Sequence, residues 1–334
     1  MKARLRWGWM LAAGIGLPVI AFAADGLGKA AAEFGSRNVA GDNSERLAGH
    51  VDSWTALALV VWAVLCAFWI NHERAAIRRS GLILAGLACV GICAWFAAVY
   101  AAGAITHPRP PLIALDRLKP GLLWAQAIIG AVAALVLLRA GTRAGGHGGD
   151  QPALPVRNEA RRYGRVSRYL HWTTAILFVC LIPMGTFTSM IPEGAWYRQG
   201  YYVVHKTLGL VVLGLVLARV GWHLRVGRPG HDPALRRWEA LLAGGVHGLL
   251  YFLMLAFPIT GFVMSTFGGK LSHFFVWDLP LWWAKDMDAV VPWALAHKIV
   301  LPYLALLILG AHVLGAVKHH YFDRNPQMIR RMVG

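Results

Sequence analysis

Seven apolar runs, each about 20 residues long, constrain this chain more than any other feature of its sequence. A helix needs about 20 apolar residues to cross a hydrocarbon core of ~30 Å. The runs lie at 53–70, 81–103, 121–139, 169–189, 203–223, 243–265 and 293–317. Only 15% of the 334 residues are charged, against roughly 25% in soluble domains. The sequence therefore predicts an all-α integral membrane protein.

The distribution of basic residues predicts how the chain is oriented. A net charge of +17 would suggest a nucleic-acid partner for a soluble protein, but here the basic residues lie between the apolar runs. Loops on one side of the predicted membrane hold 18 Lys and Arg residues, and loops on the other side hold 11. Basic residues concentrate on the cytoplasmic side. We expect a multi-pass inner (plasma) membrane protein with a cytoplasmic C-terminus and no nucleic-acid partner.

The N-terminus is typical of a signal peptide. Three basic residues precede a short apolar stretch at 7–22, and Ala21-Phe22-Ala23 offers a small-x-small cleavage site. An uncleaved anchor helix is the alternative, and residues 25–52 are periplasmic in both cases. We expect a signal peptide at 1–23, a three-helix membrane region of unassigned role at 24–140, a cytoplasmic linker rich in Gly and Pro at 141–160, and a four-helix domain at 161–334.

The two membrane regions differ in their histidines. The cores of the three N-terminal runs hold none, whereas five lie inside or at the ends of the C-terminal runs: His171, His205, His247, His297 and His312. An ionisable residue at membrane depth is costly and indicates function. The alternating direction of the runs puts His171 and His312 near the cytoplasmic face, and His205 and His297 near the periplasmic face. The fifteen residues from His297 to His312 correspond to roughly 22 Å along a helix and about 60° around it, so both rings can face the interior.

Two neutral imidazoles that face each other across a bundle are the ligand set of a six-coordinate b-type haem. The four cysteines form no CxxC or CxxCH pair, which excludes a disulfide framework and a covalent c-type haem. No carboxylate or cysteine accompanies either histidine pair, so zinc and di-iron centres fit poorly. We expect two haems b. Gly209, Gly310 and Gly315 would admit a porphyrin close to the backbone, or serve ordinary helix packing.

Four stretches resemble the bacterial cytochrome b561 family: RYGRVSRYLHW (162–172), YYVVHKTLG (201–209), VHGLLYFLMLAFPITGFVM (246–264) and GAHVLGAVKHHYFDRNPQMIRRM (310–332). The resemblance covers about residues 161–334. It implies a four-helix dihaem membrane cytochrome, related to the cytochrome b subunits of hydrogenases and formate dehydrogenases. It also implies electron exchange with the quinone pool, and superoxide as the electron donor in one branch.

The resemblance implies the same ligand pairs, His171 with His312 and His205 with His297. There is one departure, because the family spacing of the last-helix pair is fourteen and this chain has fifteen with Pro302 between them. His247 matches a recurrent third-helix histidine, either a partner of a haem carboxylate or a substitute ligand.

Several further side chains bear on the site. Arg219 would snorkel or pair with a haem carboxylate, and Lys206 and Lys298 would attract anions such as superoxide. The loop 268–296, rich in Trp and Phe, is either an aromatic interface belt or a lid that shapes a quinone or oxidant site. We expect His319 and His320 at the interface or beside haem carboxylates. The solvent-exposed histidines are expected to be His223, His231 and His273.

The favoured function is a cytochrome that carries electrons between quinone and a periplasmic donor or acceptor, and a superoxide oxidase-like activity falls within it. The second reading is an anchor subunit that passes electrons from a partner dehydrogenase of the hydrogenase or formate dehydrogenase type. The third is a haem-free transporter or assembly protein, although the runs hold almost no carboxylates for a proton or metal path. The cytoplasmic loops lack a GxGxxG fingerprint, which argues against a nicotinamide nucleotide donor.

Overall fold

The computed structural model describes residues 43–72, 77–84, 154–191, 198–325 and 327–333, with scattered positions between 121 and 135. The predicted signal peptide, most of the second and third predicted spans and most of the linker lie outside the described residues. Their boundaries therefore stay predictions.

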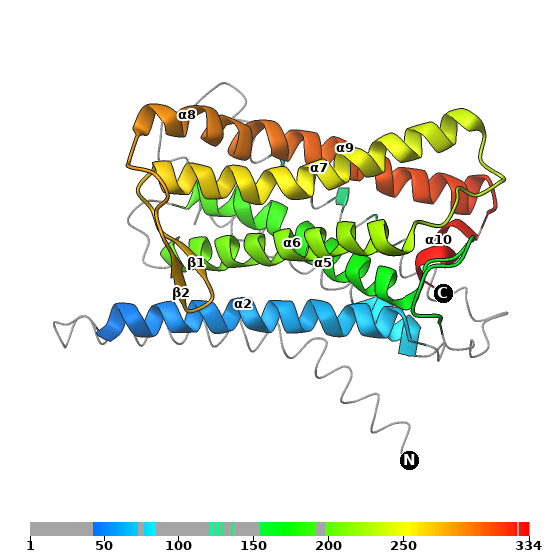
Figure 1. Cartoon of the computed structure of the whole chain (residues 1–334), viewed down its shortest axis with the longest axis horizontal. Helices are drawn as coiled ribbons and strands as arrows, with labels where there is room; N and C mark the ends of the chain where they lie inside the picture. The colour runs from blue at the N-terminus through cyan, green and yellow to red at the C-terminus, as the bar shows by residue number, and fades with distance from the viewer. Residues whose placement is uncertain are drawn as a thin grey trace, which may run out of the picture.

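Four long apolar helices make up the C-terminal half of the chain. They are α5 (Arg165–Met190), α6 (Arg198–Val226), α7 (Arg237–Phe267) and a last helix that runs from Met287 to Phe322. Each is long and apolar enough to cross a bilayer. They lie side by side along the long axis of the molecule (Figure 1). The predicted all-α membrane fold of this region is confirmed.

The last helix contains two π turns. It consists of α8 (Met287–Leu295), the π turn η2 (Ala296–Val300), α9 (Leu301–Val317) and a second π turn, η3 (Lys318–Phe322). The N–H of Leu301 bonds to the carbonyl of Ala296, five residues back. Pro302 follows directly and has no N–H to donate. A π turn accommodates one extra residue in a helix, which is what the spacing of fifteen between His297 and His312 requires.

A short hairpin connects α7 to α8. Strand β1 (Ser272–Phe274) pairs antiparallel with β2 (Trp277–Leu279). Two neighbouring residues of α6 hold it in place: Lys206 Nζ donates to the carbonyl of Leu271 at 2.7 Å, and Thr207 Oγ1 donates to the carbonyl of His273 at 3.1 Å. We call this the hairpin end of the bundle.

The opposite end is closed by the C-terminus, and we call it the C-terminal end. The short helix α10 (Gln327–Val333) lies beside the start of α5 (Figure 1). Trp172 Nε1 donates to the carbonyl of Met332 at 2.9 Å, and Arg168 Nη2 donates to that of Arg330 at 3.1 Å. The side chains that anchor α10 therefore flank His171.

One N-terminal helix, α2 (Asn43–Ile70), packs against both α5 and α6 (Figure 1). Its buried stripe recurs every three or four residues, as in a helix packed along one face, and comprises Ala56, Leu59, Trp62, Ala63, Cys66 and Ile70. The ring of Phe68 stacks on Tyr169 of α5 at 6.2 Å. The helix begins at Asn43, ten residues before the predicted span. The N-terminal region thus contributes to the core of the C-terminal bundle.

We predict that Trp62→Ala destabilises the whole bundle, because Trp62 is 1% exposed within this shared core. The loss should be on the order of 3 kcal/mol, as for other buried tryptophans. Val64 lies on the same helix and is 49% exposed. Val64→Ala is therefore the matched control and should change the free energy of unfolding by less than about 1 kcal/mol. Thermal unfolding can be followed with a thiol-reactive dye, since Cys66 and Cys180 are buried. Equal midpoints for the two variants would contradict the packing of α2.

Candidate functional site

The predicted histidines form two groups, one at each end of the bundle. At the hairpin end, His205 on α6 and His297 in η2 face each other with ring centres 6.1 Å apart and ring planes at 83°. A metal–imidazole bond is about 2 Å long, so two imidazoles on opposite sides of one metal ion have their ring centres about 6 Å apart. The separation therefore fits a metal ion held between the two rings.

Two glycines leave room for these rings. A Cβ on Gly185 of α5 would lie 2.8 Å from Cε1 of His205, and a Cβ on Gly261 of α7 would lie 2.8 Å from Cε1 of His297. Any larger residue at either position would displace the imidazole. Sequence reasoning missed both glycines, although Gly261 lies in the PITG segment of the third family-like stretch.

The glycines that the sequence singled out have different surroundings. A Cβ on Gly209 or Gly315 would meet nothing within 4 Å, and one on Gly310 would meet only Ile129 Cδ1, at 3.6 Å. Open space beside Gly209, one turn from His205, is compatible with a flat cofactor next to the backbone.

Hydrogen bonds set the orientation of the His297 ring. Thr260 Oγ1 donates its only proton to the carbonyl of Ala256 at 2.6 Å and lies 3.1 Å from Nδ1 of His297. The hydroxyl oxygen therefore accepts from Nδ1–H, and Nε2 keeps its lone pair for a metal, as in other ligating histidines. Nδ1 of His205 is buried and has no hydrogen-bond partner among the described residues.

Three histidines, rather than two, gather at the C-terminal end. The ring of His312 contacts His247 of α7, with centres 5.3 Å apart. His171 accepts a hydrogen bond at Nδ1 from Arg219 at 2.9 Å, and it lies within electrostatic range of both His312 and His247. The structure thus brings all three predicted residues together, while the ring contact of His312 is with His247 and not with the expected partner His171.

The prediction that His223 is exposed to solvent is wrong. His223 is only 7% exposed, because it faces α7, where Tyr251 Oη lies 3.1 Å from its Nδ1. It follows Arg219 by four residues on α6, so the two side chains lie on the same face of the helix. His231 is exposed as expected, and His273 bonds across the hairpin to Asp278.

A lysine and two tryptophans lie at the hairpin end. Lys206 is bound to the carbonyl of Leu271, so its ammonium is held beside the histidine pair. Trp282 packs edge-on against Phe262 at 5.2 Å, and Trp283 stacks on Phe267 at 5.1 Å. The hairpin therefore lies over the His205 side of the bundle, while the two tryptophans lie against the end of α7.

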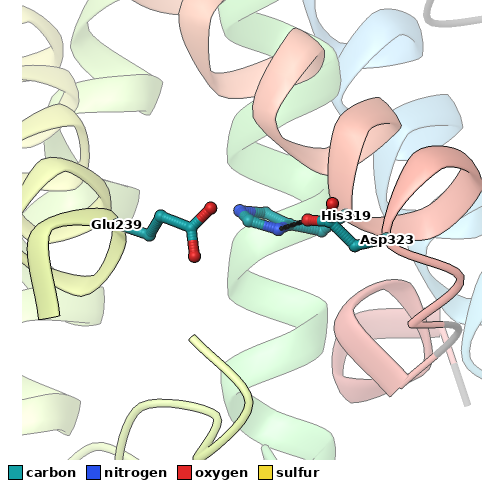
Figure 2. A group of neighbouring side chains, drawn as sticks. All are labelled: Glu239, His319 and Asp323. Carbon is teal, nitrogen blue, oxygen red and sulfur yellow. Dashed lines mark hydrogen bonds and ion pairs between the residues drawn. The ribbon is translucent and has the colours of Figure 1, made fainter. Parts of the chain in front are cut away.

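Glu239, His319 and Asp323 converge at the C-terminal end (Figure 2). Their donor atoms could hold a metal ion, but Lys318 Nζ already lies 2.8 Å from both carboxylates. Hydrogen bonds from Lys318 and then His319 lower the pKa of the Asp323 carboxyl below its usual value. We interpret the group as an ion-pair network that joins the start of α7 to the end of the last helix, because the lysine supplies the cation.

The comparisons with known proteins agree with this geometry. The family model described as prokaryotic cytochrome b561 matches residues 162–334. Cytochrome b561 homolog 2 of Escherichia coli (strain K12) is 32% identical over 180 residues, which are 53% of this chain and 94% of the relative. Cytochrome b561 homolog 1 of the same organism is 25% identical over 177 residues, 51% of this chain and 97% of the relative. A probable superoxide oxidase CybB of Yersinia pestis is 23% identical over 172 residues, 52% of this chain and 96% of the relative.

About half of this chain thus corresponds to nearly the whole of each relative. The matched stretch of the family model carries both histidine groups and the four long helices. This chain belongs to the prokaryotic cytochrome b561 family of membrane electron-transfer proteins, with an N-terminal extension that packs on the same bundle.

Proposed function

We propose that this chain is a dihaem b-type cytochrome of the bacterial inner membrane that transfers electrons between the quinone pool and a periplasmic donor or acceptor. The observation that carries the proposal is the pair His205 and His297, whose ring centres are 6.1 Å apart, a separation at which both imidazoles could bind one iron. Family membership supports b-type haem as the cofactor.

The proposed ligands follow from the two histidine groups. His205 and His297 would hold the haem at the hairpin end, and His171 and His312 would hold the other, with His247 as the alternative partner of His312. A haem b with two imidazole ligands accepts and releases single electrons. The chain's own contribution is to present the ligands: Thr260 leaves Nε2 of His297 free to bind, while Gly185 and Gly261 admit the two rings.

Superoxide is the periplasmic donor that the residues favour. A relative is named a probable superoxide oxidase, and Lys206 and Lys298 neighbour the hairpin-end histidines in sequence, where positive charge attracts a small anion. In the overall reaction two superoxide anions each lose one electron and become dioxygen, and one quinone takes up both electrons and two protons to become quinol. The excess of basic residues in the opposite loops supports a periplasmic hairpin end and a cytoplasmic C-terminus.

The first prediction concerns haem content. Pyridine haemochrome analysis of the purified full chain should show b-type haem only, close to two per chain, because two separate histidine groups are present. A haem content near zero, or a c-type signal, would contradict the proposal.

The second prediction concerns ligation. His205→Leu should remove one haem and leave the other low-spin, and His171→Leu should do the same for the opposite haem, since each iron needs both imidazoles. Haem content and the low-spin optical and EPR spectra measure this. His231→Leu is the control, because His231 is exposed and makes no hydrogen bond or ring contact with either group in the described residues. Loss of a haem in His247→Leu but not in His171→Leu would assign the C-terminal-end iron to His247 and His312 instead.

The third prediction concerns the electron donor. Reduction of the haems by superoxide should slow as ionic strength rises, because attraction of an anion is screened by salt. It should slow further in the double variant Lys206→Glu and Lys298→Glu. It should slow much less in Lys285→Glu, because Lys285 is an exposed residue of the segment between β2 and α8. Stopped-flow reduction with superoxide, and with quinol as the parallel donor, measures both rates. Haems that react with quinol but not with superoxide would eliminate superoxide as the donor.

A further inference from the structure

A polar cluster that the proposed function does not use lies beside His171 at the C-terminal end. Arg219 and His223 come from α6, Arg228 from the segment after it, and Tyr251 from α7. The guanidinium carbons of both arginines lie 5.1 Å from the centre of the Tyr251 ring. His223 Nδ1 lies 3.1 Å from the phenolic oxygen. The four side chains therefore form one connected group, which begins at the His171 ring.

Some hydrogen-bonding atoms of this group have no partner. A guanidinium only donates, so Arg219 donates to Nδ1 of His171 and also to the phenolic oxygen of Tyr251. The phenol can give its single proton to Nδ1 of His223, and in that tautomer the imidazole proton is on Nε2. That Nε2 and the Nε of Arg219 are both buried without a hydrogen-bond partner among the described residues. These two nitrogen atoms are N–H donors, so a ligand that bonds to them must supply hydrogen-bond acceptors.

The positive charge of the cluster further restricts the chemical class of ligand that it can bind. Arg219 and Arg228 are permanently positive, and within the described part of the chain neither forms an ion pair with a carboxylate. The electrostatic neighbours of Arg219 are two tyrosines and Arg228. Arg219 is partly buried, and a charge removed from water without a counter-charge is unfavourable, whereas Arg228 is exposed. The ligand that fits is therefore an anion with at least two acceptor oxygens, which describes a carboxylate.

We propose that Arg219, His223, Arg228 and Tyr251 bind the carboxylate groups of the haem at the C-terminal end. The inference rests on the proposed function, which places that haem on His171. An imidazole that binds iron through Nε2 carries its proton on Nδ1, so Arg219 could no longer donate to His171 and its guanidinium would be released for a carboxylate. Arg228 and Tyr251 do not touch the histidine ligands in any described contact, so they act on the cofactor through its carboxylates alone.

The test compares Arg228→Gln with Arg225→Gln in the purified holoprotein. Both variants remove one exposed positive charge near the end of α6, but only Arg228 contacts the Tyr251 ring in the described residues. Transfer of haem to excess apomyoglobin should become roughly tenfold faster for one of the two haems in Arg228→Gln, as expected for a lost charge-assisted hydrogen bond. It should change less than about twofold in Arg225→Gln. The unchanged second haem reports that the variant is folded, and Tyr251→Phe, which removes only a hydroxyl, should also speed transfer of the same haem.

A second experiment tests whether the cluster binds the carboxylate groups of the cofactor. The full chain, produced without haem, is loaded with haem or with haem dimethyl ester, which has no free carboxylate. The wild-type chain should release the ester faster than haem, and Arg228→Gln should then release the ester at the wild-type rate. An effect of Arg228→Gln that persists in full with the ester would overturn the inference.

Other outcomes separate this inference from the proposed function. Two tightly held haems in Arg228→Gln, with loss of reduction by quinol, would overturn the inference and assign the cluster to the quinone. A wild-type chain that holds no haem would overturn the proposed function itself, before any variant is compared.

Discussion

Hydrocarbon offers no hydrogen-bond partner, so every polar group that the chain carries into the membrane must find its partner inside the protein. The backbone meets this requirement by forming helices, and the few polar side chains meet it by clustering. His297 bonds to Thr260, His171 bonds to Arg219, and His223 bonds to Tyr251. Polar side chains that cannot reach water therefore pack against one another. They form one polar site at each end of the bundle, with apolar residues between the two sites.

The π turn at η2 links this chemistry to the winding of the last helix. His297 and His312 belong to opposite ends, and their relative angle depends on every residue between them. The bond from Leu301 to Ala296, next to a proline that cannot donate, absorbs one extra residue. As a result, His297 faces His205 on α6 although the spacing departs from that of the family.

The N-terminal extension takes part in the same packing. Helix α2 buries Trp62 and Cys66 against α5 and α6, the helices that carry His171 and His205. The relatives correspond to about half of this chain. A cytochrome domain that resembles complete proteins thus shares its core here with an added helix, so the extension can influence the histidine sites through α5 and α6.

The sequence alone determined the membrane fold, the four C-terminal helices and the levels of His171, His205, His297 and His312, because apolar run length, loop charge and the 3.6-residue repeat are local properties. Only the tertiary structure decided which rings meet at the C-terminal end. Contacts such as His312 with His247, the bond of Arg219 to His171 and the burial of His223 depend on how separate helices rotate against each other. That rotation is set by packing over many residues, including the π turn and glycines such as Gly185 and Gly261 that let a histidine ring approach. No short stretch of sequence contains this information.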